Sequence, residues 1–198
     1  MIHSFLKAKH WQLFMLIFGL PVIFQFIAFA NMFSSMLAQT TPNPEEMMQG
    51  MRWMILLVIP IYGVFFGWFW SVAIGLQSKI PEHVTMKVKK FKILFFIPLL
   101  YLLGMLVYFF FAFSSFFQLN PIPNPQLILG VFAIILPLHL FSMFCIFYIM
   151  YFVSKTLKTV ELQREVKFGD FVGEFFMVWF FPIGIWMIQP KVNKMIEV

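Results

Sequence analysis

Charged residues are scarce in this chain, and cysteine is nearly absent. Asp, Glu, Lys and Arg together make up 11% of the 198 residues, whereas soluble domains carry about 25%. So few charges cannot cover the surface of a water-soluble fold. The single cysteine, Cys145, excludes an internal disulfide and a metal site built from several thiolates.

Short motifs of common catalytic and cofactor sites are also missing. The sequence contains no HExxH, no GxSxG and no glycine loop of the kind that binds phosphates. His3, His10 and His83 do not have the spacing of metal ligands. The Asp and Glu residues all lie in loops, in the tail or at an interface, which argues against a proton or sodium relay. We therefore expect no metal, no cofactor and no catalytic residue.

Long apolar stretches are what the chain does have. Hydrophobic residues make up 62% of it, and its mean hydropathy is +0.90. A helix needs roughly 20 apolar residues to cross a hydrocarbon layer of about 30 Å. Four stretches reach this length, at about 11–36, 53–76, 93–117 and 127–153. They predict an all-α integral membrane protein, a single domain over 1–198 with four transmembrane helices in two hairpins.

The positions of the cations predict the orientation in the membrane. Lys and Arg concentrate on the cytoplasmic side of membrane proteins, and here they gather before the first stretch, between the second and third, and after the fourth. These cations are Lys7, Lys9, Lys79, Lys87, Lys89, Lys90, Lys92, Lys155, Lys158, Arg164 and Lys167. The connections 37–52 and 118–126 contain only one cationic residue, Arg52. We expect a cytoplasmic N-terminus and contacts of the cations with anionic lipid headgroups, not with nucleic acid.

The tail contains a fifth apolar stretch, 175–188, which is too short for a standard span. Its aromatic residues Trp179 and Trp186 flank Pro182 and Gly184, a pattern typical of a segment at headgroup depth. We predict that 175–198 associates with the membrane as a re-entrant or interfacial helix, with a tilted fifth span as the alternative. The polar stretch 154–174 is expected to be a cytoplasmic linker that extends the fourth helix and breaks at Gly169-Asp170, where Asp170 caps the next helix.

One proline lies near the centre of each of the four long stretches. Pro21 and Pro98 are separated by the same 77 residues as Pro60 and Pro137. This register indicates a possible tandem repeat of one helical hairpin, over 10–76 and 87–153. Four helices of similar length would give similar spacings without duplication.

The polar residues inside the apolar stretches are few. Apart from tyrosines, His139 is the only ionisable residue near the centre of a span, and such a residue is a candidate for a functional site. Tyr62 has the equivalent position in the proposed repeat, and Gln25 lies near the middle of the first stretch. The three predict a polar pocket at mid-membrane. The alternative is that one hydrogen bond to a neighbouring helix satisfies His139.

The second stretch has a regular row of small residues. Gly63, Gly67, Ser71 and Gly75 recur every four residues, so they share one face of a helix and allow a neighbouring backbone to approach closely. We predict that this face receives a bulky helix, either the fourth span or a helix of a partner chain. A lipid or cofactor lying in the groove is the alternative.

The ending FGDFVGEFFMVWFFPIGIWMIQPKVNK resembles the C-terminal region of uncharacterised multi-pass membrane proteins of bacteria. This resemblance covers about a fifth of the chain. It implies a location in the bacterial cytoplasmic membrane and implies no particular activity.

The leading functional interpretation is a non-enzymatic accessory or interaction protein of the membrane. It would pack against a membrane protein partner or a second copy through the Gly63–Gly75 face and expose 154–174 to the cytoplasm. The runner-up is a small transporter or channel with a pocket near His139. A third interpretation is a lipid-modifying enzyme with His139 or His83 as its base.

Overall fold

The computed structural model describes residues 2–37, 44–116 and 125–197, and these ranges contain no strand. The elements are α1 (Ile2–Lys7), α2 (His10–Phe14), the π-helix η1 (Met15–Gly19), α3 (Leu20–Leu37), α4 (Pro44–Gly75), the 3-10 helix η2 (Gln77–Lys79), α5 (Val88–Phe116), α6 (Pro125–Leu162), α7 (Phe168–Trp179) and α8 (Phe181–Glu197). The prediction of an all-α membrane protein is confirmed.

Four helical segments are long and apolar enough to cross a membrane, as the sequence predicts. They are His10–Asn31, Leu57–Lys79, Val88–Phe111 and Leu129–Leu162. The first of them runs continuously through α2, η1 and α3. The other three lie within or extend just past α4, α5 and α6. Each of the four is therefore long enough to cross a hydrocarbon layer of about 30 Å.

Proline explains the one π-helical turn in the first span. Pro21 has no N–H to donate to the helical ladder, and its ring needs room beside the preceding turn. The π-helix η1 ends just before it at Gly19, and the N–H of Leu20 bonds to the carbonyl of Met15, five residues back. A wider turn of this kind accommodates a disturbed ladder. Prolines also lie inside α4, α5 and α6.

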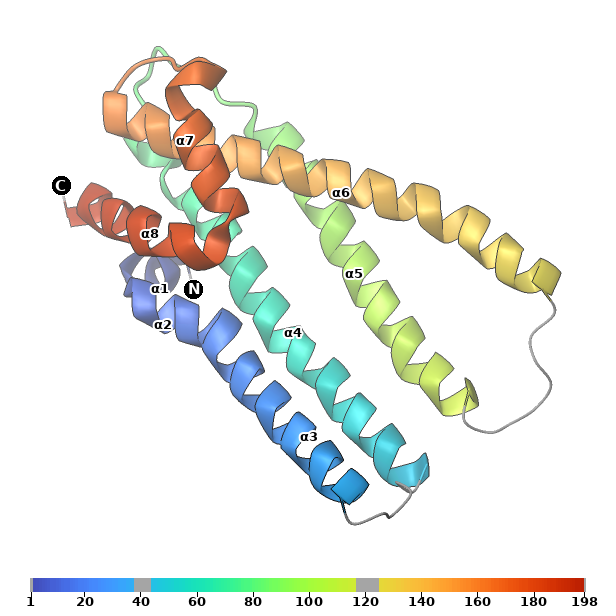
Figure 1. Ribbon diagram of the computed structural model, residues 1–198. Helices are drawn as coiled ribbons and strands as arrows, with labels where there is room; N and C mark the ends of the chain where they lie inside the picture. The colour runs from blue at the N-terminus through green and yellow to red at the C-terminus, as the bar shows by residue number, and fades with distance from the viewer. Residues whose placement is uncertain (1, 38–43, 117–124, 198) are drawn as a thin grey trace.

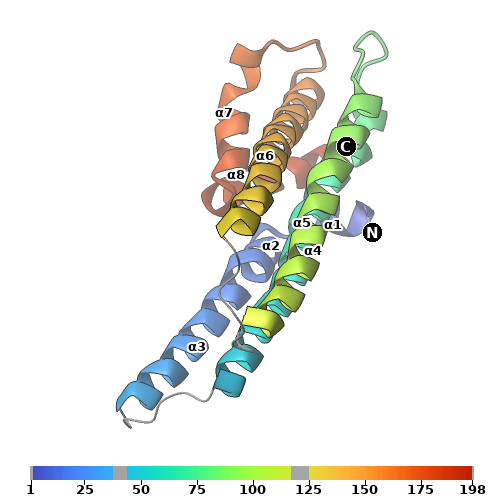
Figure 2. The ribbon, with the colours of Figure 1, turned by 90° about the vertical axis from the view of Figure 1, so that its right-hand side faces the viewer.

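The helices form two long antiparallel hairpins that leave one densely packed end of the molecule (Figure 1). This packed end consists of α1, α2, α7 and α8 with the adjoining parts of α4, α5 and α6. Both termini and the α4–α5 and α6–α7 connections lie there, and the view from the side shows the same grouping (Figure 2). Away from it, α5 and α6 separate (Figure 1). The two hairpins correspond to the possible repeat 10–76 and 87–153, which stays a prediction.

The hydrophobic core lies at the packed end and is built mainly of aromatic side chains. Trp68 and Phe69 of α4 are fully buried. Phe181 of α8 packs edge-on against Trp68, with ring centroids 5.0 Å apart, in the favoured geometry for such rings. Along the second span 39% of the most apolar window is buried inside the protein, against 11% in each of the other three. Helix α4 is therefore the central helix.

The tail folds back on itself and does not cross as one helix. Helix α7 packs along α6, and α8 returns across α1 and α2. The chain reverses at Phe180, whose backbone leaves the helical region at φ −86° and ψ 54°. The stretch 175–188 is therefore split between two helices, and it is not among the four spanning segments. This agrees with the re-entrant or interfacial interpretation and not with a fifth span.

The position predicted for the break in 154–174 is wrong. Helix α6 continues to Leu162 and α7 already begins at Phe168, so the stretch is mostly helical. Gln163 ends α6 in the left-handed region, with φ 50°, and its N–H bonds to the carbonyl of Thr159. A local αL residue of this kind terminates a helix, and sequence patterns point to Gly or Asn there instead of Gln.

Asp170 caps α7 from the third position of the helix, not from the residue before it. Its Oδ2 accepts the N–H of Lys167 at 2.8 Å, and its Oδ1 lies 3.0 Å from the guanidinium of Arg164. The backbone bond and then the guanidinium lower the pKa of Asp170. A carboxylate at this position also interacts favourably with the positive end of the helix dipole.

Gly184 makes the turn between α7 and α8 possible. A Cβ atom there would lie 1.7 Å from the carbonyl oxygen of Met177, so the two backbones would have to separate. We expect Gly184→Ala to destabilise the hairpin by about 1–3 kcal/mol, the usual range for overpacking. Thermal unfolding in mild detergent, followed by tryptophan fluorescence, measures the effect.

Gly173→Ala is the matched control. Gly173 lies in α7 on an exposed position where a Cβ would meet nothing within 4 Å. We expect this variant to be neutral or slightly more stable, because alanine restricts the unfolded chain. Equal melting temperatures for the two variants would show that the tight turn is not formed.

Candidate functional site

The structure pairs His139 with a residue that the sequence analysis did not select. Nδ1 of His139 on α6 lies 3.2 Å from Oη of Tyr101 on α5, a hydrogen bond between two spanning helices. Within the described residues, no hydrogen bond or ring contact joins His139 to Tyr62 or Gln25. Tyr62 instead packs against Phe66 of its own helix, and Gln25 is exposed on α3. The structure thus brings His139 together with Tyr101, and the pocket of His139, Tyr62 and Gln25 stays a prediction.

A signal for the Tyr101–His139 pair is present in the sequence. Tyr101 follows Pro98 by three residues, and His139 follows Pro137 by two. Because α5 and α6 are antiparallel neighbours with their prolines near mid-span, residues within one turn of either proline lie near the middle of the membrane. Comparing the third stretch with the fourth would therefore have found the partner that comparing the second with the fourth missed.

The Tyr101–His139 pair lies on the outer surface of the α5–α6 hairpin. His139 is exposed, and its neighbours Leu138 and Leu140 are 50% and 58% exposed. Leu100, beside Tyr101, is 65% exposed. The pair is thus a small polar feature in an apolar surface, not the wall of an internal cavity.

The small-residue face of α4 is occupied by the N-terminal helix of the same chain. A Cβ at Gly67 would lie 2.7 Å from the ring of Phe5. At Gly75, a Cβ would lie 2.7 Å from side-chain atoms of Ile2 and of Leu6. Helix α1 therefore packs where the sequence analysis expected the fourth span or a partner chain. The glycines permit this close approach, because a Cβ at either position would displace the side chains of Phe5 or of Ile2 and Leu6.

The other two members of the face have different roles. Ser71 is buried, and its hydroxyl donates to the carbonyl of Gly67 at 2.7 Å, so its polar group is satisfied within α4. Gly63 is exposed, and a Cβ there would meet nothing within 4 Å. The face therefore continues beyond α1 as an open surface at Gly63.

A single buried amide joins three helices at the packed end. The Oε1 of Gln189 on α8 accepts the indole N–H of Trp68 on α4 at 2.7 Å. Its Nε2 donates toward the carbonyls of Phe5, Leu6 and Ala8 at 3.1, 3.2 and 2.8 Å. The last carbonyls of a helix have no partner within it. Gln189 therefore supplies partners for the end of α1 while it holds the central tryptophan.

Asn193 repeats this capping one helical turn later. Its Nδ2 donates to the carbonyl of Leu6 at 2.7 Å and is 3.2 Å from that of Ala8. Residues 189 and 193 of α8 lie on the same face because they are four apart. The two amides together fix the end of α1 against α8.

A cluster of four charges joins α6, α7 and α8. Lys158 of α6 binds Glu161 at 2.7 Å and Glu174 at 3.2 Å. Lys191 of α8 binds the same two carboxylates, at 3.4 and 3.2 Å. Glu174 of α7 is the most buried member, with its side chain 8% exposed. Two cations and two anions balance one another, so the cluster is a structural clamp for the returning tail.

In the part of the chain that the structure describes, no three His, Cys, Asp or Glu side chains are placed to hold a metal ion. The chain is a helical membrane protein with four candidate spans, and its buried polar groups at the packed end serve to join helices. Comparison with models of protein families, with curated proteins and with solved structures finds no match.

Removal of the Gln189 amide should loosen the packed end. Gln189→Leu leaves the buried Trp68 N–H without its partner, and a buried unsatisfied group costs about 1–3 kcal/mol. It also removes one donor from the carbonyls of Leu6 and Ala8, which keep their contacts with Asn193. We expect a loss of about 2 kcal/mol or more in the free energy of unfolding in detergent, measured by denaturant titration. Trp68→Phe should cost less, and Trp70→Phe, which removes no described hydrogen bond, should cost least. An unchanged midpoint for Gln189→Leu would contradict the role of the amide.

The charge cluster makes a second, separate prediction. Glu174→Gln leaves Lys158 and Lys191 sharing one carboxylate, so α7 and α8 should detach more often. Because Lys191 is 39% exposed, we expect about 1–2 kcal/mol, below the 3–5 kcal/mol of a fully buried pair. Trypsin should therefore cleave the Glu174→Gln variant faster at Arg164 and Lys167 than the unchanged protein. This difference in rate should be smaller at high salt, which screens the ion pairs in both proteins. Glu165→Gln, outside the cluster, is the control; equal cleavage rates for both variants would exclude the clamp.

Proposed function

We propose that this chain is a non-enzymatic accessory protein of the bacterial cytoplasmic membrane that binds a partner membrane protein through its transmembrane surface. The observation that carries the proposal is the Tyr101–His139 hydrogen bond on the outer face of α5 and α6. A polar pair that faces hydrocarbon is unfavourable. A partner helix that covers it would supply further polar or close-packed contacts.

The unequal burial of the spans supports this proposal. In α4, 39% of the most apolar window is buried inside the protein, whereas in α6 only 11% is buried. Leu136, Leu140 and Phe144 of α6 are all more than half exposed. In this proposal, part of that surface is covered by the partner and the remainder by lipid.

The open end of the small-residue face supplies a second contact. Gly63 is exposed on α4 with free space around it, and Ile59, one turn away, is 45% exposed. Small residues allow helices to approach closely in membranes. The Gly63–Gly75 face thus serves two neighbours in our proposal: α1 at Gly67 and Gly75, and a partner helix at Gly63.

We further propose that the packed end lies in the cytoplasm, with the N-terminus. Lysines gather at this end, and positive charge marks the cytoplasmic side. In this orientation the end of α6 and the start of α7, within 154–174, face the cytosol. The charged clamp of Lys158, Glu161, Glu174 and Lys191 then lies at the cytoplasmic boundary.

A small transporter or channel is the second candidate, and the same hydrogen bond favours it. His139 is a titratable group that links two spans, as proton-linked transport requires. In that case His139→Ala should abolish a flux or a pH response measured in proteoliposomes. An accessory protein would show no flux to lose.

Photo-crosslinking in cells tests the leading proposal. We expect a crosslinker at Leu140, beside His139, to capture one defined membrane protein that also co-purifies stoichiometrically in mild detergent. His139→Leu should reduce this capture severalfold, because the partner loses its polar contact. A crosslinker at Phe26, 69% exposed on α3, serves as the control and should capture lipid only. Lipid adducts alone from both positions would refute the proposal.

A further inference from the structure

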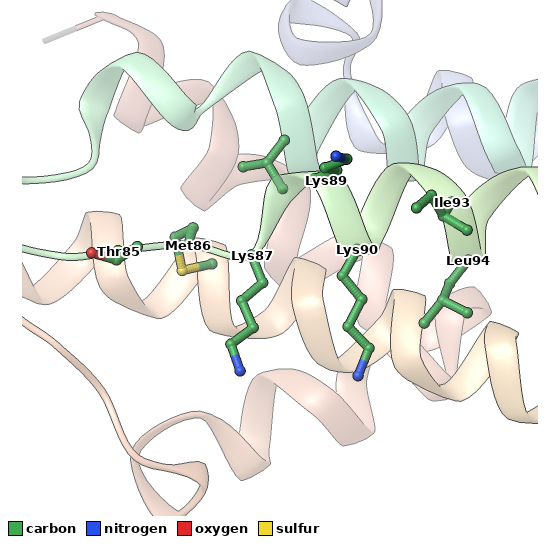
Figure 3. A pocket seen from close by; sticks show the side chains of 8 residues that line it. Thr85, Met86, Lys87, Lys89, Lys90, Ile93 and Leu94 are labelled. Carbon is green, nitrogen blue, oxygen red and sulfur yellow. The ribbon is translucent and has the colours of Figure 1, made fainter.

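A surface hollow with an unusual combination of side chains lies where α5 begins (Figure 3). Figure 3 shows Lys87 and Lys90 extending from the same side of the chain, with Lys89 on the other side. The residues that line the hollow are Thr85, Met86, Lys87, Val88, Lys89, Lys90, Ile93 and Leu94. The surface between the two ammonium groups is therefore mostly hydrocarbon.

The ammonium group of Lys90 is held toward α6. Its Nζ lies 4.9 Å from the centre of the Tyr148 ring, a cation–π distance. Tyr148 thereby restricts Lys90 without neutralising it. The positive charge remains available to an anion that approaches from the lipid side.

The charge of Lys87 and Lys90 is not balanced within the protein. At the same end of the molecule, Lys158 and Lys191 bind two glutamates, and Arg164 binds Asp170. Among the described residues, no carboxylate lies within ion-pair distance of Lys87 or Lys90. The hollow is thus a site of uncompensated positive charge beside an apolar surface.

The order of the residues in the hollow along the membrane normal matches the structure of a phospholipid. The third spanning segment begins at Val88, so Lys87 and Lys90 lie where the helix enters the membrane. Leu94 is four residues further along, about 6 Å deeper at 1.5 Å per residue. A phospholipid has its phosphate at the outer level and its acyl carbons at the inner one.

We propose that this hollow binds an anionic phospholipid, with its phosphate between the ammonium groups of Lys87 and Lys90 and the start of one acyl chain against Ile93 and Leu94. The charges select an anionic headgroup, and the apolar lining selects a molecule with hydrocarbon attached. An acidic peptide would leave that lining unused. The inference goes beyond the proposed function and does not depend on it, because the site is on a different part of α5 from Tyr101.

Native mass spectrometry of the full-length protein in mild detergent tests this site. Phosphatidylglycerol and phosphatidylcholine with identical acyl chains are added in turn, and bound lipid per chain is counted. We expect one tightly bound phosphatidylglycerol and weaker phosphatidylcholine. Lys87→Gln with Lys90→Gln should weaken phosphatidylglycerol binding roughly thirtyfold, because each lysine near an anionic lipid contributes about a factor of five.

Lys89→Gln with Lys92→Gln is the matched control. It removes the same charge from the same end of α5, and all four lysines are exposed. Lys92 does not line the hollow, and Lys89, although it contributes to the lining, extends on the other side of the chain from Lys87 and Lys90 (Figure 3). This pair should retain nearly all of the phosphatidylglycerol. Equal losses in the two double variants would mean diffuse attraction and overturn the proposal, as would equal binding of the two lipids.

Two further additions separate the lipid from other anions. Inorganic phosphate or an acidic peptide, at the concentration of the lipid, should not displace phosphatidylglycerol, since neither uses the apolar lining. Ile93→Ser should weaken lipid binding severalfold without changing the melting temperature, because Ile93 is 57% exposed. Displacement by phosphate or by the peptide would overturn the assignment of a lipid.

Discussion

The packed end depends on one buried amide. Gln189 of the returning helix α8 lies where α8 meets the central helix α4 and the N-terminal helix α1. It forms hydrogen bonds to the Trp68 side chain of α4 and to the backbone carbonyls of Phe5 and Ala8 at the end of α1. In an apolar core each of these polar groups would be costly without a partner. The amide therefore selects one mutual arrangement of helices whose apolar contacts alone would tolerate several.

Other features of the packed end follow from this arrangement. With α8 held against α1, Lys191 reaches the two glutamates that also bind Lys158, so α7 is clamped between α6 and α8. Helix α1 is held over Gly67 and Gly75, which gives the small-residue face an internal neighbour. Lys87 and Lys90, which have no carboxylate partner among the described residues, lie at the membrane boundary of α5. The paired charges of Lys158, Lys191 and the two glutamates thus hold the tail in place. The unpaired charges of Lys87 and Lys90 lie at the lipid boundary in our proposal.

The spans could be predicted from the sequence because a helix needs roughly 20 apolar residues to cross the hydrocarbon layer, and such stretches can be counted directly. The reversal of the tail was also predictable from its short apolar run between two tryptophans. Contacts between distant segments were not. Trp68 and Gln189 are separated by 121 residues, and no periodicity marks them as partners. A row of small residues predicts that another helix packs closely against it. The row does not indicate that this helix is the six-residue α1 at the N-terminus. His139 was noticed as a polar residue in a span, yet its partner Tyr101 depends on which helices are adjacent.

The hydrogen bond between Trp68 and Gln189 holds the interior of the packed end together, and it can be observed directly. Hydrogen exchange of the tryptophan indole N–H groups, followed by NMR on the protein in nanodiscs, reports each side chain separately. The Trp68 indole should exchange orders of magnitude more slowly than that of Trp11, whose side chain is 49% exposed. Exchange of Trp68 as fast as that of Trp11 would contradict the account, because the three helices would then not be joined at this point.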